Sequence, residues 1–192
     1  MLDPREGIAP DGTIVTGAAR SRVPGVFEPL IAAAVEELSA RSQVSVYLYG
    51  SVATGQAQPG RSDVDLLTAG LDRDDARAVA TSLSEGFPGL CRGVGIAVAD
   101  AEDLVGESDE AYGFRVFLRH YCVHLYGPDL GNHLPAFRAD AHAARGFNGA
   151  AMTVRGGGAV GVLSRGRMRL GLPRPARLPG RPGGSRPGAR AR

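Results

Sequence analysis

The sequence predicts an α/β fold in which helices flank a mixed sheet. Segments with helical and with extended apolar patterns follow one another in the order α–β–β–α–β–α–β–α, which is typical of such layers. The 192 residues are enough for one domain with a core of its own. The composition changes abruptly near residue 150. We therefore expect an N-terminal extension at 1–22, a domain at 23–150 and a tail at 151–192.

The first half of the domain contains one helix and two strands. A helix over about 26–41 is indicated by apolar residues that share one face, with Pro29 tolerated in its first turn. A strand at 44–49 is followed by a brief helix or turn at 51–55. The second strand covers 62–69. The shared face of the helix consists of Phe27, Leu30, Ile31, Ala34, Val35 and Leu38.

The second half continues the alternation. Asp72 is a favourable N-cap for a helix over 73–85. A strand rich in small residues covers 93–99. The remaining segments predict a helical turn at 101–104, a helix at 110–120, a strand at 122–126 and a helix at 134–147. Near the N-terminus, 13–16 is expected to be a short extended piece.

The tail differs from the domain in charge. All 22 basic residues of the chain are arginine. Residues 1–150 hold 12 of them and all 20 acids, whereas 151–192 hold 10 arginines, 10 glycines, 5 prolines and no acid. Such a segment buries too little apolar area to offset its chain entropy, so we expect it to be disordered. The change of composition also resembles a reading-frame change in a GC-rich gene.

These features limit the partners and the location. The tail could attract nucleic acid only without sequence specificity, and it has no aromatic residue for stacking on bases. The chain has no run of 18 apolar residues and no basic-then-apolar leader, so neither a membrane span nor a signal peptide is expected. Its two cysteines, Cys91 and Cys122, suggest no disulfide framework. A cytoplasmic location is predicted.

The stretch from Tyr49 to Asp65, YGSVATGQAQPGRSDVD, carries the clearest chemical signal. Asp63 and Asp65 are two residues apart in a strand and so point to the same side. Two such carboxylates repel each other unless a cation lies between them, and Mg²⁺ prefers oxygen ligands of this kind. Gly50 and Ser51 follow the first strand, where a glycine and a helix start favour phosphate. A surface turn with capping aspartates is the alternative, but it does not explain acids inside an apolar run.

This pattern resembles the nucleotidyltransferase superfamily that includes DNA polymerase β. It is most similar to the small bacterial members related to aminoglycoside nucleotidyltransferases. Gly50, Ser51, Asp63 and Asp65 match the family motif position by position. The resemblance implies a nucleotidyltransferase-type core that moves a nucleoside monophosphate from an NTP to a hydroxyl acceptor with Mg²⁺. It implies metal binding and catalysis by the two aspartates, and phosphate binding by Gly50 and Ser51.

The third carboxylate of that family comes from the neighbouring strand, and here it is missing. No acid occurs in 92–99, and the register points to Gly95 as its counterpart. Asp100 is the next candidate, although its parity places it on the other face. Two functions therefore stay open: an enzyme impaired by the missing acid, or a non-catalytic member that binds nucleotide or a partner. Arg61 and Arg92 flank the motif and are available either to phosphate or to solvent.

Overall fold

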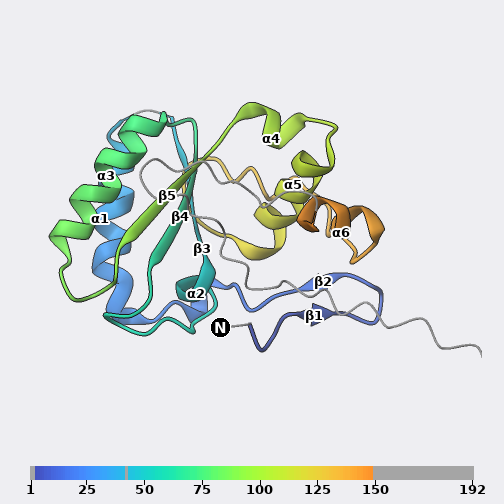
Figure 1. Ribbon diagram of the computed structural model, residues 1–192, viewed down its shortest axis with the longest axis horizontal. Coiled ribbons are helices and arrows are strands. Elements are labelled where there is room, and N and C mark those ends of the chain that lie inside the picture. Colours follow the sequence, from blue (N-terminus) through green and yellow to red (C-terminus); the bar gives the residue numbers. More distant parts are fainter. Residues whose placement is uncertain (1–2, 42, 149–192) are drawn as a thin grey trace, which may run out of the picture.

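A four-stranded mixed sheet forms the centre of the protein (Figure 1). The computed structural model describes residues 3–41 and 43–148. The strand order is β5-β4-β3-β6, with β3 antiparallel to β4 and β6, and β4 parallel to β5. The predicted fold class, a mixed sheet flanked by helices, is confirmed. The strands are β3 (Ser45–Tyr49), β4 (Val64–Ala69), β5 (Val94–Ala99) and β6 (Val123–Tyr126).

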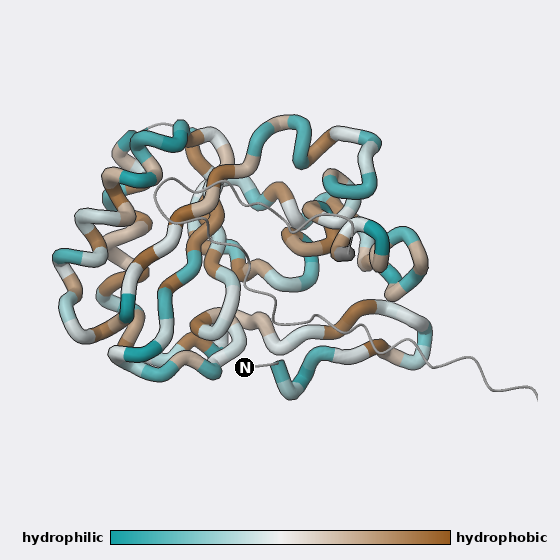
Figure 2. The backbone as a smooth tube through the Cα atoms, viewed as in Figure 1, coloured by the Kyte–Doolittle hydropathy of each residue, from teal (hydrophilic) through white to brown (hydrophobic). Residues whose placement is uncertain are grey.

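Helices cover both faces of this sheet, with α1 and α3 on one face and α4 and α5 on the other (Figure 1). Successive strand residues alternate between the two faces. Val46 and Leu48 pack on the α1 and α3 side, whereas Tyr47 and Tyr49 pack toward α5. Apolar residues line the strands accordingly (Figure 2). The helices are α1 (Glu28–Ser39), α2 (Gly50–Ala53), α3 (Arg73–Gly86), α4 (Ala101–Val105), α5 (Asp109–Tyr121) and α6 (Ala141–Asn148), with short 3-10 turns η1 (Arg20–Arg22) and η2 (Gly25–Phe27).

Local sequence signals explain where two long helices begin. The Asp72 carboxylate accepts hydrogen bonds from the backbone N–H groups of Asp74 and Asp75, so the predicted cap of α3 is confirmed. The Ser108 hydroxyl caps α5 by accepting from the N–H of Ala111 at 3.1 Å. This cap starts α5 at Asp109, one residue before its predicted start.

The N-terminal segment forms a hairpin of β1 (Gly7–Ile8) and β2 (Ile14–Val15) beside the loop that precedes α6. The N–H of Ile14 donates to the carbonyl of Phe137, and the N–H of Ala139 donates to the carbonyl of Gly12, both at 3.0 Å. Because this pairing holds the loop extended, α6 begins at Ala141 and not at residue 134, where the helical pattern placed it. The extended piece expected at 13–16 contains β2, and its partner β1 was not predicted.

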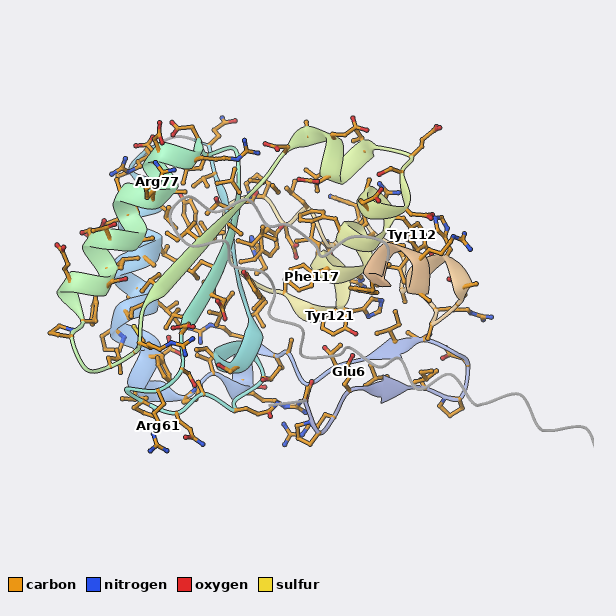
Figure 3. The ribbon with its side chains drawn as sticks, in the orientation of Figure 1. Glu6, Arg61, Arg77, Tyr112, Phe117 and Tyr121 are labelled. Atoms are coloured by element: carbon orange, nitrogen blue, oxygen red, sulfur yellow. The ribbon has the colours of Figure 1, made fainter. Side chains whose placement is uncertain are left out.

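The hairpin segment also contacts α5. The Tyr121 hydroxyl donates to Glu6 Oε1 at 2.9 Å, and Figure 3 shows Tyr121 between Glu6 and Phe117. Glu6 and Ile14 of this segment are thus packed on the α5 side of the fold. The tail expected at 151–192 lies outside the described residues. Within 3–41 and 43–148, no helix has both the length and the apolar character needed to cross a membrane.

Candidate active site

Asp65 lies on β4 between two neighbours in register, Tyr49 on β3 and Gly95 on β5. This position is at the end of the sheet where β3 turns into α2. Asp65 points to the α5 face, since Tyr49 packs edge-on against Phe117 with ring centroids 5.2 Å apart. A half-buried carboxylate therefore lies at a strand end, next to a turn that lacks bulky side chains.

Gly50 leaves the space that the Asp65 carboxylate occupies. Its φ of +73° is in the left-handed region that favours glycine. A Cβ at this position would lie 2.7 Å from Asp65 Oδ2, closer than van der Waals contact allows. Both requirements select glycine at the strand–helix junction. Ser51 follows within α2, whose first turn has no side-chain cap.

Asp63 is held by the guanidinium of Arg92. Arg92 Nε donates to Asp63 Oδ1 at 3.0 Å, and its terminal nitrogen forms an ion pair with Oδ2. The Arg92 side chain is 72% exposed and that of Asp63 is 34% exposed. Sequence reasoning identified Arg92 only as a residue available to phosphate or solvent. The sequence carries no local signal that pairs Arg92 with Asp63, because this contact depends on how β4 and β5 pair.

The electrostatics of the pair are unfavourable without a further cation. Burial, and to a lesser extent the negative charge of Asp63, together raise the pKa of Asp65 to about 6, even though Arg92 opposes both effects. Burial, and then the Asp65 carboxylate, raise the pKa of the Tyr49 hydroxyl, which keeps it neutral. Among the described residues, no hydrogen-bond donor contacts the Asp65 carboxylate. The site thus contains one carboxylate with a counter-ion and one without.

Strand β5 presents no side chain to either acid. A Cβ on Gly93 would lie 3.9 Å from Asp63 Oδ1, and a Cβ on Gly95 would lie 3.7 Å from Asp65 Oδ1. Gly95 is thus the residue next to Asp65, as the register argument predicted. Residues 3–41 and 43–148 contain no group of three His, Cys, Asp or Glu side chains placed to hold a metal ion. A third carboxylate does not accompany the pair.

Asp100 is not brought to this site. It lies five residues beyond Gly95, at the opposite end of β5, which is about 16 Å along a strand. There its side chain caps α4 and forms an ion pair with Arg73. The structure therefore brings Gly50, Ser51, Asp63 and Asp65 to one end of the sheet and leaves Asp100 at the other.

Comparison with known proteins agrees with this geometry at the level of the family. Residues 31–86 match the family model described as "Nucleotidyltransferase domain". The matched segment contains Gly50, Ser51, Asp63 and Asp65. The resemblance noted from the sequence is confirmed at this level.

One solved structure that is similar to the chain is described as "Crystal structure of the toxin-antitoxin with AMP-PNP". It shares 17% sequence identity with a TM-score of 0.38, and the alignment covers 61% of this chain and 83% of that chain. A likeness at this level does not bear on activity. The comparison with curated proteins finds no match.

The uncompensated charge of Asp65 predicts how stability depends on pH. Its pKa is raised in the folded state, so the ionised form opposes folding. This cost is absent below about pH 4, grows as the pH rises toward 6 and is constant above that. We expect Asp65→Asn to stabilise the metal-free protein by about 1–3 kcal/mol at pH 8 and to have little effect at pH 4.

Thermal melts in a chelating buffer at several pH values measure this difference. Asp11→Asn is the control of opposite sign, because the N–H of Thr13 donates to Asp11 at 2.9 Å and lowers the pKa of that carboxyl. A lower melting temperature for Asp65→Asn than for the parent at pH 8 would show that Asp65 has a stabilising partner in the folded state.

Proposed function

We propose that this domain binds a nucleoside triphosphate together with Mg²⁺ and transfers the nucleoside monophosphate to a hydroxyl acceptor slowly. One observation carries the proposal: the Asp65 carboxylate lies beside Asp63 and directly against Gly50, at the end of the sheet. The negative charge that would attract a cation therefore lies next to a glycine whose backbone a phosphate can approach. We assign this function to residues 23–150.

The residues present fit a divalent cation. Carboxylate oxygens are the ligands that Mg²⁺ prefers, and two carboxylates plus nucleotide phosphates are a common set for it. Asp65 has no counter-ion of its own, and Asp63 already holds the cationic group of Arg92. Asp63 and Asp65 would hold the ion. Once bound, it would neutralise the charge that develops on the phosphate oxygens during in-line transfer.

The chain's own residues would supply position and charge. Gly50 lets the backbone approach the triphosphate, and Ser51 follows it at the uncapped start of α2. The half-buried position of Asp65 strengthens its attraction for a cation, because water screens it less. The acceptor hydroxyl must lose a proton, and β5 offers glycine where a carboxylate would take it. We therefore expect nucleotide binding to be efficient and transfer to be slow.

A non-catalytic role is the second candidate, and Gly95 is the observation that favours it. Without a third acid, the site has the elements of a nucleotide-binding site but lacks a general base. In this role the domain would bind Mg²⁺ and NTP, and a partner would recognise the occupied form. Whether pyrophosphate is released from NTP distinguishes the two roles.

Isothermal titration at pH 8 with Mg²⁺ and NTP tests the binding step. Asp65→Asn keeps the shape of the side chain and removes its charge, so we expect the Mg²⁺-dependent affinity for NTP to fall by about tenfold or more. Asp100→Asn is the matched control at the far end of β5 and is expected to bind as the parent does. Equal affinity in Asp65→Asn and the parent would refute the assignment of this site.

A further inference from the structure

Arg92 is paired with the Asp63 carboxylate, which a cation at this site would need as a ligand. Its planar fork uses both oxygens of Asp63, through Nε at 3.0 Å and through the terminal nitrogen. The guanidinium is the only positively charged group that contacts the acid pair among the described residues. A cation that binds Asp63 through either oxygen must displace at least part of this fork.

We propose that Arg92 exchanges partners during ligand binding: it holds Asp63 in the empty site and turns to the nucleotide phosphates when a divalent cation takes that carboxylate. This inference rests on the proposed function and deepens it, because it names the residue that couples the metal to the nucleotide. Arg92 is then a positioning and specificity residue for phosphate.

The backbone of Arg92 is fixed, so the exchange needs only the side chain to move. The N–H of Arg92 donates to the carbonyl of Ser62, and the carbonyl of Gly93 accepts from Val64, both at 3.0 Å. These bonds anchor the residue just before β5, at the same end of the sheet as Gly50. The side chain itself is 72% exposed and free to adopt other rotamers.

Energetics favour an exchange over a permanent pair. An ion pair this exposed contributes little to stability, so a cation can break it at small cost. A phosphate accepts the same two-pronged contact from a guanidinium and carries more charge than a carboxylate. A cation alone must break the pair without compensation. With nucleotide present, the released Arg92 gains a phosphate, so each ligand strengthens the binding of the other.

The experiment compares Mn²⁺ binding with and without a non-hydrolysable ATP analogue, measured by electron paramagnetic resonance of free Mn²⁺ at pH 8. Without nucleotide, Arg92→Gln is expected to bind Mn²⁺ about two- to fivefold tighter than the parent, because no ion pair has to be broken. With the analogue, the gain in Mn²⁺ affinity that nucleotide gives the parent is expected to shrink by about fivefold or more.

Arg77→Gln is the matched control. Arg77 lies on α3 and forms an ion pair with Asp74 at 2.7 Å. Figure 3 shows it far from Arg61, which precedes β4 at the end of the sheet where the acid pair lies. It removes one paired arginine and the same charge, so both Mn²⁺ affinities should equal those of the parent. Arg92→Lys keeps the charge without the planar fork and is expected to lie between parent and Arg92→Gln. If Arg92→Gln does not fold, Arg92→Lys still tests whether the two-pronged contact with Asp63 competes with Mn²⁺.

Two results separate this inference from the function on which it rests. Suppose that Asp65→Asn abolishes Mn²⁺ binding, but Arg92→Gln binds Mn²⁺ no tighter than the parent when nucleotide is absent. Arg92 then stays paired with Asp63 when the metal binds, and the exchange is refuted. If Asp65→Asn binds Mn²⁺ as the parent does, the proposed metal site itself is wrong. Tighter Mn²⁺ binding by Arg92→Gln with reduced coupling supports both.

Discussion

Gly95→Asp is expected to raise nucleotidyl transfer by about 10²-fold or more, the range that a positioned general base supplies. The new carboxylate would stand beside Asp65, since Gly95 is its partner in the parallel register of β4 and β5. The space exists: Gly95 is exposed, and a Cβ there meets Asp65 Oδ1 at 3.7 Å, an ordinary contact. The substitution would complete a set of three acids at one strand end.

The measurement is the release of labelled pyrophosphate from NTP with Mg²⁺, with water and a panel of hydroxyl compounds as acceptors. Gly95→Asn is the control of equal size without charge and is expected to stay at the parent rate. Without metal, Gly95→Asp should melt at a lower temperature than Gly95→Asn, because three neighbouring carboxylates repel one another. Fast transfer by the parent that Asp100→Ala abolishes would show that Asp100 takes the third role and that Gly95 does not.

Gly50→Ala is expected to lower the free energy of unfolding by about 1–3 kcal/mol and to weaken nucleotide binding by about tenfold. Two effects add. Alanine is strained at a φ of +73°, and its Cβ would lie 2.7 Å from Asp65 Oδ2. The carboxylate can move to relieve this contact, but it then leaves the position from which it would hold a cation. Stability and binding are therefore expected to fall together.

Chemical denaturation and titration with Mg²⁺ and NTP measure these losses. Gly89→Ala is the matched control, because Gly89 has a φ of +80° and nothing within 4 Å of an added Cβ. It reports the backbone strain alone, so the excess loss in Gly50→Ala reports the contact with Asp65. In an Asp65→Ala background that excess should vanish. A loss for Gly50→Ala no larger than for Gly89→Ala, with nucleotide affinity intact, would contradict this account.

The segments with strong local patterns were predictable from the sequence. The four strands of the central sheet follow from their apolar runs, and the cap of α3 follows from Asp72. The start of α6 was not predictable in this way. Its helical pattern extends back to residue 134, but pairing of Phe137 and Ala139 with the N-terminal hairpin keeps that segment extended. A contact between residues more than 120 positions apart leaves no local signal.

The sequence by itself determined the motif of Gly50, Ser51, Asp63 and Asp65 and the absence of an acid from residues 92–99. Gly50, Ser51, Asp63 and Asp65 are close in the chain, and a strand's alternation fixes which side chains share a face. Only the tertiary structure decided what surrounds Asp65 and Asp63. Strand order and register between β4 and β5 place Arg92 on Asp63, Gly95 beside Asp65 and Asp100 at the far end. Those relations depend on pairing between distant segments, which a single sequence does not encode locally.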